Sequence, residues 1–252
     1  MHAAEAHDSR IRRWTLIVIL ISLGLRVWGL NAQSIWRDEA DSLAIAGSLT
    51  QIRSMFTTPG HNAPLYFLLL RGWQDLVGTG LPAARLFSAL WGALAVALTY
   101  AVGRRLFCAR LGALAALCAG LSPYLVWYSQ EARTYAPLVA FALLSVWLFL
   151  RALEGRRAGA WIAWALCSGL CLYLHLLAAL LIIAQAGIGL VWGLRERRFP
   201  WMGILALAGV LLVGAPLLAW EVRLLLNPLS SGYAPAGPGQ MKEEATIPLE
   251  RT

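Results

Sequence analysis

Charged side chains are scarce in this sequence, and their scarcity excludes most classes of soluble protein. Of the 252 residues, 13% are charged and 59% are hydrophobic, whereas soluble domains contain about 25% charged and roughly 45–50% apolar residues. A disordered chain or a small secreted domain does not fit this composition. The formal net charge of +8 comes from so few residues that we expect no nucleic-acid partner. The composition therefore predicts an integral membrane protein.

Cysteine is also scarce, and the four cysteines all lie in or beside apolar runs. Their spacing matches no metal or redox motif. Cys167 and Cys171 share one face of an expected helix, where packing is their ordinary role. We expect no disulfide framework. A glycine-rich phosphate loop, a zinc-binding pair and a serine nucleophile elbow are also missing from the sequence.

Long apolar runs predict the framework of the fold. About 20 apolar residues are needed for a helix to cross a bilayer. The run at 159–194 would be roughly 50 Å long as one helix, so we expect a break near His175 that divides it into two spans. We predict an all-α integral membrane fold with seven transmembrane helices, at 14–30, 83–103, 111–127, 135–152, 159–175, 176–194 and 200–220.

Arginine clusters predict the orientation of these spans. With seven spans and a cytoplasmic N-terminus, four clusters that hold 12 of the 21 basic residues fall on the cytoplasmic side. Counting the apolar stretch 64–77 as an eighth span would move nine of these twelve outside, against the excess of Lys and Arg in cytoplasmic loops. We therefore expect 64–77 to be an amphipathic helix on the outer surface, beginning at Pro64.

This topology divides the chain into three parts. Residues 1–13 form a cytoplasmic N-terminus, and residues 14–220 form the seven-span module. Its first external loop, 31–82, is large and is expected to carry two juxtamembrane helices, the first of which begins near Asp38. Residues 221–252 are rich in Pro and Gly and then in charge, so we expect a disordered external tail.

Polar residues of the types that catalyse reactions or bind ligands gather near the outer ends of the spans. Acids and fixed cations together at an apolar surface suggest a site for an anionic amphiphile. Each also has an ordinary role, because acids favour helix N-termini and arginines near span ends reach to headgroups. The candidates are Asp38, Glu39, His61, Arg85, Glu131, Arg133, Tyr135 and His175.

Four segments in a fixed order give the chain a family resemblance. They are SIWRDEADS (34–42), HNAPLYFLLLRGW (61–73), AARLFSALWG (83–92) and SPYLVWYSQEARTYAP (122–137). With these segments the chain resembles polyprenyl-phosphate-dependent glycosyltransferases of the GT-C superfamily, in the family-39-like group of protein O-mannosyltransferases and aminoarabinose transferases. The resemblance covers residues 14–194 and implies the N-terminal seven-span module of that family.

The resemblance implies an inverting transfer of a sugar from a polyprenyl-phosphate donor to an acceptor hydroxyl on the extracytoplasmic face. It implies that Asp38 is the general base and that Glu39 orients Asp38 or the acceptor. Because the donor phosphate already activates the sugar, we expect no cofactor. A divalent metal among Asp38, Glu39 and Glu131 is an alternative that we do not favour.

The leaving lipid phosphate needs positive charge, which arginine supplies through paired N–H donors. We therefore expect Arg133 and Arg85 to hold the phosphate and Glu131 to position Arg133. His61 is expected to touch the phosphate or the sugar. Tyr135 and His175 complete the expected substrate-binding set.

Two features depart from the family pattern. Many relatives have two prolines after the histidine, where this chain has Asn62-Ala63-Pro64. Relatives also continue beyond the seventh span. A partner subunit that supplies a C-terminal half is therefore one expectation. The sequence does not identify the acceptor. Two alternatives stay open, namely a non-catalytic or truncated subunit that binds lipid-linked sugar, and a lipid-sugar flippase. A transporter would have ionisable residues inside several spans, whereas here Arg26 alone lies noticeably inside one.

Overall fold

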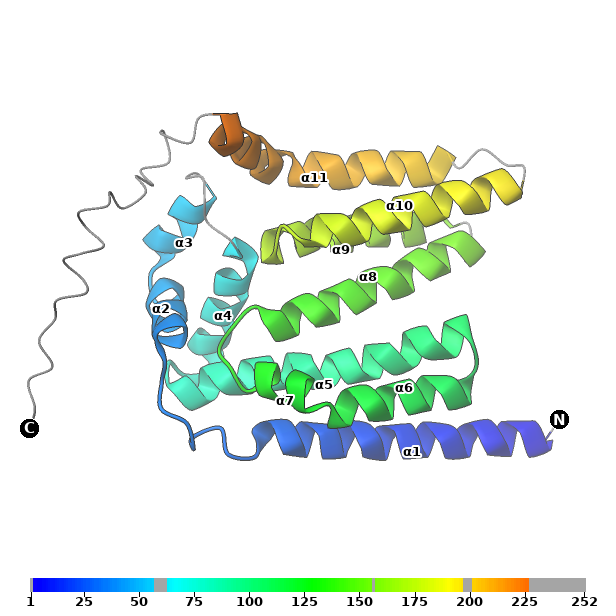
Figure 1. The fold of residues 1–252 in the computed structure, drawn as a ribbon, viewed down its shortest axis with the longest axis horizontal. Coiled ribbons are helices and arrows are strands. Elements are labelled where there is room, and N and C mark those ends of the chain that lie inside the picture. Colours follow the sequence, from blue (N-terminus) through cyan, green and yellow to red (C-terminus); the bar gives the residue numbers. More distant parts are fainter. Residues whose placement is uncertain (1, 57–62, 156, 197–200, 227–252) are drawn as a thin grey trace, which may run out of the picture.

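The computed structural model describes residues 2–56, 63–155, 157–196 and 201–226, and all regular secondary structure in these ranges is α-helical. Long helices run side by side along the long axis of the molecule, and the short helices α2, α3 and α4 lie across one end of them (Figure 1). The all-α prediction is confirmed. The helices are α1 (His2–Val27), α2 (Arg37–Ala46), α3 (Leu49–Met55), α4 (Pro64–Val77), α5 (Leu81–Leu106), α6 (Ala109–Leu121), α7 (Pro123–Ser129), α8 (Tyr135–Gly155), α9 (Ala158–Leu174), α10 (Ala178–Arg195) and α11 (Trp201–Leu226).

Several of these helices are suited to a bilayer. Within the described ranges, α5, α8 and α10 are long and apolar enough to cross a membrane, and α6 with α7 makes a fourth crossing if the bent pair is one span. Helix α9 and the first part of α11 are apolar but shorter. The chain thus has the helices of an integral membrane protein, while the count of seven spans stays a prediction.

Small residues allow α5 and α6 to pack closely. A Cβ atom on Gly112 would lie 2.6 Å from the backbone nitrogen of Arg104, and one on Gly103 would lie 2.9 Å from the Cα of Gly112. No side chain fits at such distances, so the two backbones touch where these glycines meet. Such contacts between small residues are a common basis of helix association in membranes, where lipid removes the hydrophobic driving force.

An apolar cluster fixes α2, α3 and α4 on the end of the long helices. Ile52 of α3, Tyr66 and Leu70 of α4, Phe87 of α5 and Leu174 of α9 are all buried in it. Because these side chains come from both groups of helices, their burial ties the short helices to the long ones. This cluster positions the first turn of α2, which carries the two adjacent acids of the sequence.

Helix α4 begins at Pro64, as predicted, and lies at the surface with two apolar faces. Tyr66 and Leu70 are buried against the protein, while Leu68 and Leu76 are 46% and 84% exposed. An exposed apolar face is expected of a helix that lies in a membrane interface. The preceding residue, Ala63, has a φ of 65°, which a proline at this position could not adopt, since its ring holds φ near −65°.

The predicted span 111–127 is interrupted at Ser122. Helix α6 ends at Leu121, α7 begins at Pro123, and the two axes are bent by 62°. A proline lacks the N–H of the helix ladder and forces the preceding residue out of the helical region, and Ser122 has a ψ of 116°. The sequence analysis missed this break because its apolar run continues through the proline.

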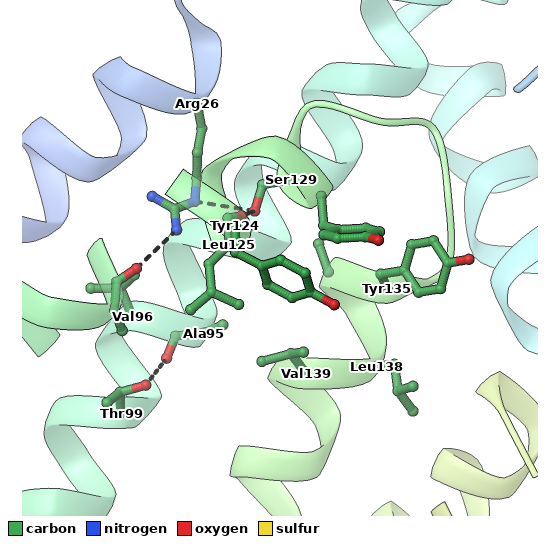
Figure 2. Close-up of a pocket in the computed structure, with 14 residues that line it drawn as sticks. Arg26, Ala95, Val96, Thr99, Tyr124, Leu125, Ser129, Tyr135, Leu138 and Val139 are labelled. Carbon is green, nitrogen blue, oxygen red and sulfur yellow. Dashed lines mark hydrogen bonds between the residues drawn. The ribbon is translucent and has the colours of Figure 1, made fainter. Parts of the chain in front are cut away.

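Arg26 of α1 forms hydrogen bonds to both sides of this break. Its Nη1 donates to the carbonyl of Gly120 at 3.1 Å and its Nη2 to that of Ala119 at 3.4 Å, while its Nε donates to Ser129 Oγ of α7 at 3.2 Å. Figure 2 shows the guanidinium beside Ser129 at one side of a cavity. Arg26 therefore binds the end of α6 and the end of α7 to α1.

Other predicted boundaries have mixed outcomes. The break near His175 is confirmed, because α9 ends at Leu174 and α10 begins at Ala178. The segment 31–82, which we predicted to be the first external loop, contains α2 and α4 near the two predicted helix starts and a further short helix, α3. Helix α11 continues to Leu226, past the predicted end at 220. The remainder of the predicted tail, 227–252, lies outside the described residues.

Candidate active site

The first turn of α2 carries Asp38 and Glu39, in the place that the sequence predicted. Acids are favourable there because the N-terminus of a helix carries a partial positive charge. Neighbouring residues on a helix point about 100° apart, and the two carboxylates accordingly have different surroundings. The side chain of Glu39 is 0% exposed, whereas that of Asp38 is 40% exposed.

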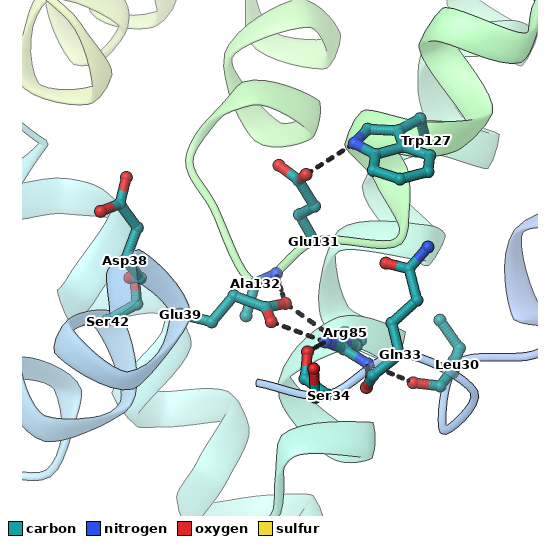
Figure 3. Close-up of polar contacts among 10 residues, drawn as sticks. All are labelled: Leu30, Gln33, Ser34, Asp38, Glu39, Ser42, Arg85, Trp127, Glu131 and Ala132. Atoms are coloured by element: carbon teal, nitrogen blue, oxygen red, sulfur yellow. Dashed lines mark hydrogen bonds and ion pairs between the residues drawn. The ribbon is translucent and has the colours of Figure 1, made fainter. Parts of the chain in front are cut away.

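Glu39 forms a two-bond ion pair with Arg85 of α5 (Figure 3). Arg85 Nε donates to Glu39 Oε1 at 2.9 Å, and Nη2 donates to Oε2 at 2.6 Å. The backbone N–H of Ala132, in the α7–α8 loop, also donates to Glu39 Oε1 at 2.9 Å. Three segments that are distant in sequence thus meet at one buried carboxylate. We call Glu39, Arg85 and Ala132 the buried fork.

The other N–H groups of Arg85 bind backbone carbonyls of the α1–α2 connection. Nη1 donates to Leu30 at 2.6 Å and to Gln33 at 3.0 Å, and Nη2 donates to Ser34 at 3.3 Å. With Glu39, these partners occupy all three nitrogens of a side chain that is 3% exposed. This geometry favours a positioning role for Arg85 over the direct phosphate contact that we predicted.

The surroundings of Glu39 keep its carboxylate charged. Burial alone would raise the pKa of Glu39, but the hydrogen bonds from Arg85 and Ala132 and the positive charge of Arg85 outweigh it, so the pKa lies below the ordinary 4.5. This ionised carboxylate accepts three hydrogen bonds and has no surface exposed to solvent. Glu39 is therefore poorly placed to accept a proton from a substrate.

Asp38 pairs with Arg133 on the more open side of α2. Arg133 Nη2 lies 3.2 Å from Asp38 Oδ2, and Nη1 contacts the backbone oxygen of Asp38 at 3.4 Å. The Cζ of Arg133 lies 5.8 Å from the centre of the Tyr135 ring, within cation–π range. Arg133 Nε is buried and has no hydrogen-bond partner among the described residues. We call Asp38 and Arg133 the open pair.

Glu131 has a different partner from the one predicted. Its Oε1 accepts a hydrogen bond from Trp127 Nε1 at 2.7 Å, and among the described residues the ion pair of Arg133 is with Asp38 instead. Desolvation raises the pKa of Glu131, and the nearby charge of Glu39 adds to this, against the hydrogen bond from Trp127 and the charges of two arginines. Glu131 and Trp127 line an open hollow together with Gln33, Ser34 and Trp36.

The two predicted histidines have separate outcomes. His61 lies outside the described residues. His175 follows the last residue of α9, and its Nδ1 accepts a hydrogen bond from the backbone N–H of Leu177 at 3.2 Å. The preceding carbonyl, of Leu174, accepts a hydrogen bond from Thr134 Oγ1 at 3.2 Å, so the His175 turn lies next to the loop that carries Arg133.

Tyr66 is a site residue that the sequence analysis did not single out. It is 1% exposed, and its hydroxyl has no hydrogen-bond partner within the described part of the chain. Burial raises its pKa, while the positive charge of Arg133 acts in the opposite direction. Its position in the segment 61–73, one of the four family segments, could have pointed to Tyr66. Nothing else in that segment distinguishes it from an ordinary packed tyrosine.

Taken together, an all-helical, membrane-suited bundle carries acids and arginines at one end, which is an arrangement for a charged substrate at a membrane surface. The family model of dolichyl-phosphate-mannose-protein mannosyltransferases matches residues 61–220. Because this match covers more than half of the sequence, the chain belongs to that family, and it is a membrane glycosyltransferase of the GT-C type.

The family match includes Arg85, Glu131, Arg133, Tyr135 and His175, whereas Asp38 and Glu39 precede its first residue. No curated protein and no solved structure matches the chain. The roles of individual side chains therefore rest on their geometry and on the resemblance of the four sequence segments.

Proposed function

We propose that this protein transfers a sugar from a polyprenyl-phosphate donor to an acceptor hydroxyl, with inversion, on the extracytoplasmic face of a membrane. The observation that carries the proposal is the open pair. A partly exposed carboxylate and a partly exposed guanidinium lie 3.2 Å apart, and the buried fork holds the same turn of α2 from the other side. A base and a phosphate-binding cation are the two groups that this transfer requires.

Asp38 acts as the general base. The acceptor O–H gives its proton to the Asp38 carboxylate while its oxygen forms a bond to the anomeric carbon. The bond from that carbon to the phosphate oxygen breaks, and the lipid phosphate leaves with the electron pair. Attack from the side opposite the phosphate inverts the anomeric configuration. A positioned base contributes roughly 10²–10⁴-fold to such a step.

Arg133 stabilises the leaving phosphate. Its charge is permanent and its N–H groups form a planar fork that suits phosphate oxygens. Its Nε has no hydrogen-bond partner among the described residues, and the side chain is 25% exposed, which leaves it capacity for a ligand. A phosphate that draws Arg133 toward itself also loosens the bond to Asp38, which frees the carboxylate for the acceptor proton.

The remaining predicted residues support these two. Glu39 and Arg85 position Asp38 by fixing α2 to α5, without touching the substrate. Tyr135 supports the Arg133 guanidinium with its ring. Glu131, in the hollow beside Trp127, is a candidate contact for the acceptor, and His61 and His175 stay predicted contacts of the donor.

The positions of the basic residues support the extracytoplasmic placement. Arg104 and Arg105 lie in the last turn of α5, at the opposite end of that helix from Arg85, and Arg195 lies in the last turn of α10. The start of α1 also lies at the end away from α2, α3 and α4 (Figure 1). Because basic residues gather on the cytoplasmic side, the site end faces outward.

The proposal is tested with the purified full chain in proteoliposomes that contain a radiolabelled polyprenyl-phosphate hexose. Membrane extract serves as the source of acceptor. We expect time-dependent release of polyprenyl phosphate and labelled product with the opposite anomeric configuration. Saturable donor binding without any consumption, with or without a candidate partner subunit, would instead support the non-catalytic alternative. Movement of intact donor between leaflets would support the flippase.

A further inference from the structure

Arg26 is a buried cation that the proposed reaction does not use. It is 1% exposed, and its hydrogen-bond partners are all uncharged oxygens. Among the described residues, no carboxylate forms an ion pair with it, in contrast to Arg85 and Arg133. A charged side chain inside a membrane protein is expensive, pairs with another charge or with backbone carbonyls, and usually marks a functional site.

The end of α6 compensates only part of this charge. The last carbonyls of a helix carry the equivalent of roughly half a negative elementary charge, and Arg26 binds two of them, at Ala119 and Gly120. This contact explains why Arg26 is held in place. About half of its charge is left to attract an anion, in surroundings where the low dielectric constant strengthens the attraction.

The guanidinium also has unused hydrogen-bonding capacity. Nε is bonded to Ser129 Oγ, and Nη1 contacts the carbonyl and the hydroxyl of Ser22 and the carbonyl of Gly120. Nη2 carries two hydrogens, yet in the described ranges its one contact is the 3.4 Å bond to Ala119. At least one N–H of Nη2 is therefore available.

Arg26 lines a cavity of about 220 Å³ between α1, α5, α6, α7 and α8 (Figure 2). This volume is several times the roughly 30 Å³ that one water molecule occupies in the liquid. The walls are mainly apolar, with Val96, Leu125 and Val139 among them, and the polar exceptions include Arg26, Ser129 and three tyrosines. Apolar walls with a few placed polar groups are typical of small-molecule sites.

The packing keeps space for the guanidinium at the cavity. A Cβ atom on Gly92 of α5 would lie 2.8 Å from Arg26 Nε and would overlap Ser129 Oγ. A larger residue at position 92 would displace both groups. The absence of a side chain there is what allows Arg26 and Ser129 to meet beside the cavity.

A row of tyrosines separates this cavity from the open pair. The rings of Tyr124 and Tyr128 have centres 4.6 Å apart, and those of Tyr128 and Tyr135 have centres 4.9 Å apart. All three tyrosines line the cavity, and the Tyr135 ring also contacts Arg133. Arg26 and Arg133 thus lie at two different places along one aromatic row, with separate bonding partners.

We propose that this cavity binds the phosphate end of an anionic membrane lipid, at a site distinct from the donor phosphate site at Arg133. Phosphate oxygens accept hydrogen bonds from Arg26 Nη2 and from tyrosine hydroxyls. The first carbons of the lipid lie against Val96, Leu125 and Val139. No covalent step is involved, and the site is independent of the proposed role of Asp38.

The test uses farnesyl phosphate as probe, with the purified full chain in phosphatidylcholine nanodiscs. Farnesol and inorganic phosphate serve as the two comparison ligands. We expect two saturable farnesyl phosphate sites, of which Arg133→Gln removes one and Arg26→Gln weakens the other by about 10- to 100-fold, the usual worth of a hydrogen bond to a charged group. A photoreactive farnesyl phosphate should label 122–129 and 135–139 in the Arg133→Gln protein.

A second variant separates loss of the site from loss of the fold, since Arg26 also caps α6. Val139→Trp fills the cavity and leaves the bonds of Arg26 intact, so it should abolish the same site. Leu114→Trp, on an exposed face of α6, is the matched control and should change nothing. A single site that disappears in Arg133→Gln would overturn the proposal, as would equal binding of farnesol or of inorganic phosphate. The proposed transferase activity could fail without affecting any of these outcomes.

Discussion

The buried fork and the open pair lie on opposite sides of one helical turn, and each joins a carboxylate of α2 to an arginine from a distant segment. In the fork, both side chains are almost fully enclosed, at 0% and 3% exposure, and two short bonds are backed by a backbone N–H. In the pair, the exposures are 40% and 25%, with one ion-pair contact of 3.2 Å.

The difference shows how adjacent acids acquire separate roles. A buried ion pair is costly to break, because the partner that remains is an uncompensated charge. An exposed pair contributes little to stability, so its members are free to change partners when a substrate arrives. The fork thus fixes the geometry of the site, and the pair is available for chemistry.

The largest effect on stability is expected from breaking the fork. Arg85→Met leaves Glu39 buried without its partner, and the free energy of unfolding should fall by about 3–5 kcal/mol. Thermal or denaturant unfolding in detergent measures this loss. Adding Glu39→Gln to the Arg85→Met protein should recover part of it, since the double variant buries no charge. A loss below about 1 kcal/mol would mean that the fork behaves as an exposed pair.

A smaller effect, on binding, is expected at the open pair. Arg133→Gln removes the charge that faces the donor phosphate, and donor affinity should fall by about 10- to 100-fold. Equilibrium binding of a polyprenyl-phosphate hexose measures it. Arg71→Gln is a matched control, because Arg71 forms a similar exposed pair with Asp75 on α4, at 2.9 Å. Equal affinity in the two variants would contradict the role of Arg133.

The open pair itself should contribute little to the free energy of unfolding. A double-mutant cycle of Asp38→Asn and Arg133→Gln should give a coupling free energy of about 0–1 kcal/mol in unfolding experiments, because solvent screens the contact. Coupling above about 3 kcal/mol would place this pair in the same energetic class as the fork.

The pH dependence of stability should differ in sign between Glu39 and Glu131. The pKa of Glu39 is lowered in the folded protein, so its contribution is present above the ordinary 4.5 and is lost as pH falls through the folded value. The pKa of Glu131 is raised, so its ionisation destabilises the fold and the penalty disappears as pH falls. Unfolding curves of Glu39→Gln and Glu131→Gln between acidic and neutral pH should deviate from the wild type in opposite directions.

Much of the fold follows from local signals in the sequence. Apolar runs predicted the long helices, Pro64 marked the start of α4, and the turn at His175 followed from the length of its apolar run. The break at Ser122 was visible in Pro123 but was hidden by continuous hydropathy. Helix α11 passes its predicted end because hydropathy alone does not fix a helix terminus.

The sequence predicted that acids and arginines gather at one end of the bundle, but it did not predict how they pair. Asp38 and Glu39 look equivalent in the sequence, and only the packing of α2 on α5 buries one and exposes the other. The partners of Arg85 include three carbonyls of an irregular segment, for which no residue pattern exists. The bond from Trp127 to Glu131 was not predictable from helical spacing, because Glu131 lies beyond the end of α7.

The most direct test of the central claim is the transfer rate of Asp38→Asn, measured together with donor binding in one purified preparation. We predict a rate lower by roughly 10²–10⁴-fold, donor affinity close to that of the wild type, and unchanged transfer by the matched variant Asp75→Asn. Wild-type turnover by Asp38→Asn would contradict the assignment of Asp38 as the base.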